Sequence, residues 1–322
     1  MSKIEALFLR CSHFLADEDE IKRVNDKYPF INVTAVDEKD YTDEQISKAE
    51  IIVGFPKPKD LIKAVNLKWL QTPSSGIEDY AKKELYVNKD ILITRATGTY
   101  GRQIADHTMG KILGFQHFLF TYRDQMKQSL WKRYYPSKDL WESTLLIVGL
   151  GDIGTQVAKR AKASEMHIIG IKRTLGEKPD FVDELYTLES LDEVLPKADY
   201  VVIAISLTDK TKHLFDAKRL SLMKKGSVLI NIARGTIIDQ DALIESLNSG
   251  HLGAAALDVT TPEPLPSDSK LWKFDNVLIT PHSSGLSYSD PHQVFDLFFA
   301  NIEHYLNDQK QMRNLVDFSR QY

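Results

Sequence analysis

The amino-acid sequence predicts an α/β protein built from two doubly wound units with parallel sheets. Apolar runs of strand length alternate with amphipathic, helix-like segments along most of the chain, which is typical of βαβ units. The alternation occurs in two series, separated by a helical stretch without proline at about residues 101–131. At 322 residues the chain is also longer than one compact core normally supports. Two domains are therefore expected.

The first series predicts strands joined by short helices. The strands are expected at 5–10, 31–36, 51–55, 68–72 and 91–96. The helices between them are expected at about 17–28, 43–49 and 59–65. The first strand leads into its helix through LRCSHFLADE, which has no glycine and cannot bring main chain close to a pyrophosphate. This series is therefore expected to hold something other than a dinucleotide.

The second series predicts a further set of strands, followed by a last helix. The strand-like runs are STLLIV, HIIGIK, ADYVVIAIS, GSVLINIA, GAAALDV and NVLITPH. The last helix is expected at 294–306, within a final stretch (290–322) that ends in a polar tail. Both series are of the same general α/β type. Their sequences are not similar residue by residue, so they are not an internal repeat.

Composition and charge restrict the class of protein. Hydrophobic residues make up 43% and charged residues 27% of the chain, as in globular proteins, and the net charge of −4 gives no reason to expect nucleic acid or a membrane as partner. The single cysteine, Cys11, excludes an internal disulfide and any cysteine-rich metal site, and no metal is expected. Because no stretch resembles a signal peptide or a membrane span, a cytoplasmic protein is predicted.

A glycine-rich turn follows the first strand of the second series. Gly149 permits a tight turn, Gly151 lets main chain approach a pyrophosphate, and Gly154 lets the next helix pack on the strand. The turn lies between an apolar strand and a helix expected at 155–163, which is the context this motif requires. The second series is therefore predicted to bind a dinucleotide.

The next strand ends on two cations. Enzymes that use NAD usually carry an acid about 20 residues after the turn, where it binds the ribose hydroxyls and repels the 2′-phosphate of NADP. At ~4 Å and an effective dielectric near 20, that repulsion costs about 4 kcal/mol, close to a thousandfold in affinity. This chain has Lys172 and Arg173 there, with the hydroxyl of Thr174 beside them. NADP(H) is favoured and NAD(H) remains open, since a solvated strand end would carry the same charges.

Three later strand ends carry residues suited to chemistry on a 2-oxoacid. Arg234 could grip a carboxylate with its guanidinium fork. Asp258 ends a strand, Glu263 lies between two prolines, and His282 follows a strand and a proline. His282 could donate a proton to the carbonyl oxygen, while Glu263 would favour the imidazolium form. Taken singly, the arginine could equally be a surface or capping residue, and the Glu263 segment a stiff surface loop.

At this point the chain resembles the D-isomer-specific 2-hydroxyacid dehydrogenases over nearly its whole length. The motifs that carry the resemblance are LQTPSSGIEDY, ATGTYGRQIADHT, VGLGDIG, NIARGTIID, ALDVTTPEPLP and TPHSSG, in the family's order and spacing. The resemblance implies that Arg234, Glu263 and His282 are catalytic and that main chain around Ser75 and Gly76 meets the substrate carboxylate. It also implies a set of further residues along the cofactor: Asp152, Ile153, Ile205, Ser206, Thr211, Ile232, Ala233 and Asp258.

The same resemblance implies the domain organisation. Two Rossmann-like or flavodoxin-like domains with a cleft between them are expected, a discontinuous substrate domain (1–98 with 290–322) and a dinucleotide-binding domain (99–289). Gly98, Gly101 and Gly285 lie near the crossings and are expected hinge positions. Members of the family are usually homodimers joined through their cofactor domains, and the 101–131 stretch is expected to take part.

Departures from the commonest pattern refine the expected function. Lys172 and Arg173 look like the NADP-preferring branch, which is similar to glyoxylate and hydroxypyruvate reductases. The loop TPSSGIEDY has no lysine or arginine, which argues against a phosphorylated substrate. The expected activity is reduction of small 2-oxoacids to D-2-hydroxyacids. The alternatives are a nicotinamide-sensing transcriptional co-regulator on the same fold, or an NAD-dependent dehydrogenase of formate or phosphite.

Overall fold

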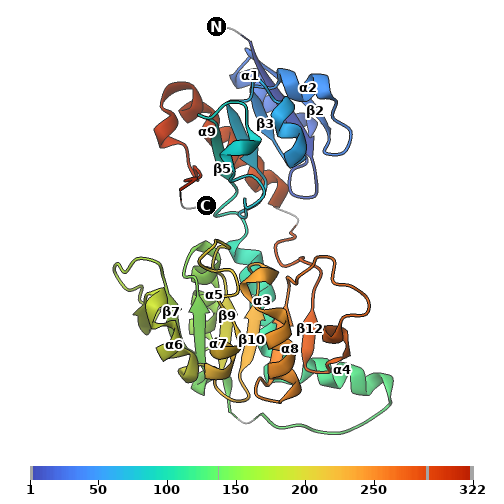
Figure 1. The fold of residues 1–322 in the computed structure, drawn as a ribbon, viewed down its shortest axis with the longest axis vertical. Helices are drawn as coiled ribbons and strands as arrows, with labels where there is room; N and C mark the ends of the chain where they lie inside the picture. The colour runs from blue at the N-terminus through green and yellow to red at the C-terminus, as the bar shows by residue number, and fades with distance from the viewer. Residues whose placement is uncertain (1–2, 137, 288–289, 320–322) are drawn as a thin grey trace. The chain divides into compact units, whose positions relative to one another are not determined.

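The computed structural model describes residues 3–136, 138–287 and 290–319, and it contains two compact units (Figure 1). Unit 1 comprises Met1–Tyr100 together with Leu286–Tyr322, and unit 2 comprises Gly101–Gly285. The sequence predicted that the chain passes from one domain to the other after residues 98 and 289. The second boundary involves residues 288–289, which lie outside the described residues.

Unit 1 is built on a five-stranded parallel sheet with the order β2-β1-β3-β4-β5. Its strands are β1 (Ile4–Arg10), β2 (Ile31–Asp37), β3 (Ile51–Val53), β4 (Trp69–Thr72) and β5 (Leu92–Arg95). Its α-helices are α1 (Glu18–Lys27), α2 (Asp43–Lys48) and α9 (Asp290–Asn307). All five strands coincide with apolar runs predicted from the sequence.

Side chains from both faces of this sheet are buried. Leu7, Leu9 and Ile52 pack on one face with Ile46 of α2. On the other face the ring of Phe8 lies 5.2 Å from that of Phe298 in α9, in an edge-to-face arrangement. Since successive side chains of a strand point to opposite faces, two apolar layers are formed, as the continuous apolar runs require.

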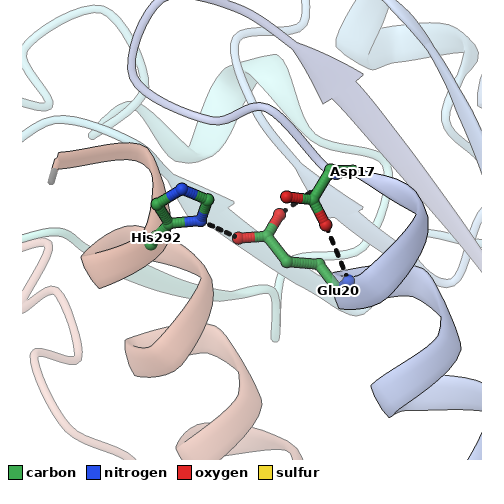
Figure 2. Close-up of side chains that lie close together, drawn as sticks. All are labelled: Asp17, Glu20 and His292. Atoms are coloured by element: carbon green, nitrogen blue, oxygen red, sulfur yellow. Dashed lines mark hydrogen bonds and ion pairs between the residues drawn. The ribbon is translucent and has the colours of Figure 1, made fainter. Parts of the chain in front are cut away.

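Helix α9 returns to unit 1 and contacts α1 directly. The side chain of Asp17 accepts from the main-chain N–H of Glu20, and the Glu20 carboxylate accepts from that of Asp17, which forms a capping box at the start of α1. Figure 2 shows Nδ1 of His292 reaching the same carboxylate from α9, at 2.9 Å. Asp17, Glu20 and His292 thus hold the two helices together, and these hydrogen bonds account for their positions.

Unit 2 contains a seven-stranded parallel sheet with the order β12-β11-β10-β9-β6-β7-β8. Its strands are β6 (Thr144–Val148), β7 (His167–Ile171), β8 (Glu184–Tyr186), β9 (Tyr200–Ile203), β10 (Val228–Asn231), β11 (Ala254–Leu257) and β12 (Val277–Ile279). Its α-helices are α3 (Gly101–Gln116), α4 (Leu119–Lys127), α5 (Asp152–Ala163), α6 (Leu191–Val194), α7 (Ala217–Leu222) and α8 (Gln240–Asn248). The strand order reverses between β6 and β9, and in open α/β sheets ligands bind at the carboxyl ends of the strands beside such a reversal.

Alternate residues of the unit 2 strands form its main core. Val148, Ile171 and Ile203 point to the face covered by α6, α7 and α8, where they pack with Leu220 and Leu243. The strand residues between them are buried as well, which is expected for a parallel sheet covered on both faces. Fold class and strand pattern therefore agree with the sequence prediction, although β8 and helices α6 to α8 were not specifically predicted.

The predicted continuous helix over 101–131 is wrong. The chain forms α3 and α4 instead, separated at Phe118, which has a left-handed φ of 53°. Gly114 makes room for the turn, because a Cβ on it would lie 2.3 Å from the ring of Phe120, which packs back against α3. The predicted helix at 59–65 is a 3-10 segment, Pro58–Lys63, and the helix after the glycine turn begins at Asp152 rather than at 155. Within the described ranges, no helix has the length and apolar character needed to cross a membrane.

Candidate functional site

The glycine turn after β6 lies at the strand reversal of unit 2, and its three glycines differ in what surrounds them. Gly149 has φ of +107°, and a Cβ on it would lie 2.5 Å from the carbonyl oxygen of Ala204. A Cβ on Gly154 would lie 2.2 Å from the carbonyl oxygen of Gly149. Gly151 borders open space, since a Cβ added there would meet no atom within 4 Å beyond its chain neighbours. The turn thus packs tightly on the sheet and stays open on the side where a pyrophosphate would approach.

The turn leads directly into α5. Gly151 is the N-cap residue and gives no side-chain hydrogen bond, so the first amides of α5 have no side-chain cap. Asp152 and Ile153 form the first helical positions, and the Asp152 carboxylate lies against Gly101, where a Cβ would be 2.6 Å from Oδ2. The main-chain N–H groups of a helix start and the positive end of the helix dipole make this a suitable place for an anion. The residues present therefore fit a dinucleotide pyrophosphate.

The two cations lie beside this turn. The carbonyl oxygen of Ile171, the last residue of β7, accepts from the N–H groups of Gly149 and Leu150 at 3.1 and 2.8 Å. Lys172 follows immediately, and its own N–H donates to the carbonyl oxygen of Tyr186. Lys172, Arg173 and Thr174 are all exposed. Their side chains therefore begin next to the proposed pyrophosphate position, where a ribose would follow.

The loop after β9 closes the other side of the turn. Ile205 follows Ala204, whose carbonyl group contacts Gly149. The hydroxyl of Thr211 donates to the carbonyl oxygen of Ser206 at 2.8 Å and accepts from the N–H of Thr208 at 2.8 Å. Thr211 is buried, so its hydroxyl fixes the shape of the loop at the carboxyl end of β9. Ile205, Ser206 and Thr211 are thereby placed at the same sheet edge as the glycine turn.

The loop after β10 presents Arg234. Asn231 is fully buried; its side chain accepts from the N–H of Ala233 and donates to the carbonyl oxygen of Arg234. Ile232 continues the strand by donating its N–H to the carbonyl oxygen of Ile203. A Cβ on Gly235 would lie 2.0 Å from the carbonyl oxygen of Thr260, so the loops after β10 and β11 pack main chain to main chain. This close approach brings the Arg234 loop against the Glu263 loop.

Glu263 and His282 form a direct pair. The Oε2 atom of Glu263 lies 2.9 Å from Nδ1 of His282, and its Oε1 atom accepts from the N–H of Thr260 at 3.0 Å. An ionised carboxylate can only accept, so Nδ1 is the donor in this contact. The pair is half-exposed. Nε2 of the ring is left to exchange a proton with a substrate, as a general acid requires.

Asp258 anchors the loop that carries His282. The residue is buried, and its carboxylate accepts from the hydroxyl of Thr280 at 2.5 Å and from the N–H groups of Ser283 and Ser284, each at 3.1 Å. Its carbonyl oxygen accepts from the N–H of His282, which has a left-handed φ of 49°. Burial acts to raise the pKa of Asp258, but these hydrogen bonds and a nearby lysine outweigh it and hold the pKa below its ordinary value. The loop is therefore tied to an ionised carboxylate.

Ser75 and Gly76 belong to unit 1 and lie after β4, at the carboxyl edge of that sheet. The Ser75 hydroxyl donates to the carbonyl oxygen of Ala96 at 3.1 Å, and Arg95 donates to the carbonyl oxygen of Ser75 at 3.2 Å. The Ser74 hydroxyl donates to the carbonyl oxygen of Gly76. The loop is fixed within its own unit, whereas the other predicted site residues all belong to unit 2.

Several residues that build this site were not predicted from the sequence. Asn231 and Gly235 shape the Arg234 loop, and Thr280 helps Asp258 to hold the His282 loop. Lys111 of α3 lies beneath that loop, with Nζ 4.0 Å from Oδ1 of Asp258. The one available signal was a lysine inside the otherwise apolar segment MGKILGF, where burial would require a counter-charge.

The structure predicts that Gly154→Ala weakens dinucleotide binding. The added Cβ would overlap the carbonyl group of Gly149, so α5 must move away from the turn. We expect the affinity for the dinucleotide to fall about 10-fold or more, since such overpacking typically costs 1–3 kcal/mol. Titration of protein fluorescence with NADPH measures this affinity. Gly110→Ala, on open space in α3, is the matched control, and equal affinities of the two variants would contradict the prediction.

The chain is similar to proteins of known family over most of its length. A family model described as the NAD binding domain of D-isomer specific 2-hydroxyacid dehydrogenases matches residues 109–284, which lie in unit 2. A glyoxylate reductase of Pyrococcus horikoshii is 34% identical over 229 residues, which are 70% of this chain and 68% of that enzyme.

Solved structures extend the similarity to the whole fold. A D-isomer specific 2-hydroxyacid dehydrogenase family protein of Aeromonas salmonicida superposes with a TM-score of 0.84 at 31% identity and covers 98% of this chain and 100% of its own. One from Xanthobacter autotrophicus, in complex with NADPH and MES, has a TM-score of 0.84 at 26% identity and covers 100% of both chains. The prediction of two Rossmann-like units with parallel sheets is thereby confirmed.

Proposed function

Because the chain belongs to the D-isomer-specific 2-hydroxyacid dehydrogenase family of oxidoreductases, we propose that it reduces small 2-oxoacids to D-2-hydroxyacids with NADPH. The contact between Glu263 and His282 carries the proposal, because it joins a candidate proton donor to a carboxylate that orients it. Arg234 lies on the loop that packs against the Glu263 loop. This combination suits a substrate with a carboxylate beside a carbonyl group.

The chemistry follows from the placement of these groups. A nicotinamide cofactor held at the glycine turn would supply the hydride for the carbonyl carbon of the substrate. His282 gives its Nε2 proton to the carbonyl oxygen, which becomes the hydroxyl group while the carbonyl carbon gains a C–H bond, and the ring regains a proton from solvent. Glu263 accepts from Nδ1 and so holds the ring in one orientation. Arg234 binds the carboxylate and polarises the carbonyl group.

The preference for NADPH rests on the end of β7. Lys172 and Arg173 are exposed cations next to the glycine turn, and the unit 2 residues described around it include no acid at the strand end that would repel a 2′-phosphate. The Xanthobacter relative was solved with NADPH. Asp152, Ile153, Ile205, Ser206, Thr211, Ile232, Ala233 and Asp258 are proposed to complete the cofactor site.

Initial rates test the function directly. NADPH and NADH would each be offered with glyoxylate, hydroxypyruvate, pyruvate and longer 2-oxoacids, and with no oxoacid as a blank. We expect oxidation of NADPH by at least one of the short 2-oxoacids. Oxidation of neither cofactor by any oxoacid would refute the proposal and favour a nicotinamide-sensing module. NAD-dependent oxidation of formate or phosphite, measured in parallel, would instead identify that type of dehydrogenase.

A homodimer is proposed as the working form. The segment around α4 exposes a group of large apolar side chains: Leu119, Met126, Leu130, Trp131, Tyr135 and Trp141. A hollow of about 550 Å³ in the same unit is lined by Phe115, Phe118 and Phe120 and by the amino ends of β9 and β10. Apolar side chains gathered in this way usually mark an interface. A second copy of the chain is the proposed occupant.

Trp131→Glu is expected to weaken this dimer. Trp131 is 91% exposed, and a buried charge in its place would remove an aromatic contact of the kind that dominates interfaces. We expect the dimer dissociation constant to rise about 10- to 100-fold in sedimentation equilibrium. Ile62→Glu, at an exposed apolar position in unit 1, is the control. A parent protein that remains monomeric at every concentration would contradict the proposal.

A further inference from the structure

Lys111 is a buried cation without a hydrogen-bond partner. It lies in the middle of α3 and is only 3% exposed. Within the part of the chain that the structure describes, no acceptor is within hydrogen-bonding distance of its Nζ atom. The closest opposite charge is the Asp258 carboxylate, at 4.0 Å, whose side chain is 1% exposed. A lysine is rarely buried in this way unless its charge is used.

The carboxylate that faces Lys111 holds the His282 loop. Three donors from that loop, the Thr280 hydroxyl and the N–H groups of Ser283 and Ser284, converge on Asp258. All three require acceptor oxygens, which an ionised carboxylate provides. An ionised carboxylate buried without a counter-charge is costly, and the cost falls if the loop opens and water reaches it. Lys111 removes this cost without occupying any of the three hydrogen-bonding positions.

The other charged groups around Lys111 do not replace this contact. His107 lies one turn earlier on α3, and burial lowers its pKa, with the charge of Lys111 adding to the effect. From α5, which packs on α3, Arg160 pairs with Asp106 at 2.5 Å, and Asp152 lies against Gly101. Burial lowers the pKa of Lys111 to about 8, and the charge of Asp258 opposes that shift. Lys111 is therefore mainly protonated at neutral pH.

We propose that Lys111 is a positioning residue for His282: as the buried counter-charge of Asp258, it keeps the 280–284 loop closed and the imidazole in place. Its effect on catalysis rests on the function proposed above, whereas its effect on the loop does not. Lys111 has no role in binding substrate or cofactor in this proposal. It acts through one intermediate group, the Asp258 carboxylate.

Hydrogen exchange of the loop in the cofactor-free protein tests the proposal without any assay of activity. In Lys111→Met, at neutral pH, we expect peptides that span Ser283 and Ser284 to exchange about 10-fold faster than in the parent. Lys111→Gln gives the same comparison if the methionine variant does not fold. Thr108→Val is the matched control, because Thr108 is buried on α3 and bonds only within the helix. Exchange at the parental rate in the Lys111 variants, or equal acceleration in Thr108→Val, would overturn the proposal.

A double-mutant comparison tests whether Lys111 acts through Asp258. In an Asp258→Asn background the buried negative charge is absent, so Lys111→Met should change loop exchange by less than about twofold. If Lys111→Met accelerated loop exchange equally in both backgrounds, Lys111 would not act through Asp258, and the proposal would be overturned. In kinetics, Lys111→Met should lower kcat about 10-fold with KM for NADPH almost unchanged, because only the acid is displaced. If the parent reduces no 2-oxoacid, the proposed function fails, and loop exchange still decides the role of Lys111.

Discussion

Replacement of His282 by alanine is expected to lower kcat for 2-oxoacid reduction about 10²- to 10⁴-fold, the usual contribution of a general acid. The variant lacks the Nε2 proton but keeps the glycine turn, Lys172 and Arg173, so its dissociation constant for NADPH should stay within about twofold of the parental value. Stopped-flow reduction with saturating NADPH measures the rate, and fluorescence titration measures the binding. The two measurements together separate a lost proton donor from a damaged fold.

Two further variants define the interpretation of that result. His304→Ala, on α9 of unit 1, serves as the control and should retain the parental rate. Glu263→Gln should lower kcat by about 10-fold only, because the acid remains and loses just its charged partner. If His282→Ala reduced 2-oxoacids at the parental rate, another group would be the acid, and the contact with Glu263 would be structural.

Lys172→Asp is expected to shift the cofactor preference from NADPH toward NADH. The substitution puts a carboxylate where the 2′-phosphate is proposed to bind, and solvent screening at this exposed position reduces the ideal repulsion. We expect NADPH affinity to fall about 10²-fold relative to NADH affinity. The ratio of kcat/KM for the two cofactors measures the change.

Lys225→Asp is the charge-matched control for that experiment. Lys225 precedes β10, at the amino edge of the unit 2 sheet, whereas Lys172 lies at the carboxyl edge. The control makes the same change in net charge away from the proposed ribose position. An unchanged cofactor ratio in Lys172→Asp would mean that Lys172 and Arg173 are a solvated strand end and that some other feature selects the cofactor.

The sequence was sufficient to predict what depends on neighbouring residues. Each predicted strand was found because its apolar run is continuous, as a sheet covered on both faces requires. The glycine turn was found because two tight contacts and one open approach, at fixed spacing, favour glycine at all three positions. The contact between Glu263 and His282 follows from two strand ends that a parallel sheet brings to one edge. The strands and the turn can be read from neighbouring residues. The Glu263–His282 contact can be read from the rule that parallel strands end at one edge of the sheet.

What the sequence did not reveal depends on contacts between distant segments. Helical periodicity continues past Phe118, and only the packing of Phe120 on Gly114 shows why the helix stops there. Asp258 was expected along the cofactor, and its hydrogen bonds to the 280–284 loop could not be anticipated, since main-chain N–H groups leave no mark in a sequence. The role of Lys111 could not be predicted, because its counter-charge, Asp258, is distant in the sequence although it is only 4.0 Å away in the fold.

The return of α9 to unit 1 has a consequence for synthesis on the ribosome. The aromatic layer around Phe8 and Trp69 is completed by Phe298 and Tyr305, which are translated only after all of unit 2. The 101–285 stretch is continuous and can fold as soon as it emerges. The first hundred residues can cover that face of their sheet only after α9 has been made. We therefore expect unit 2 to complete its core before unit 1 does, and chaperone contact during synthesis to concentrate on the segment made first.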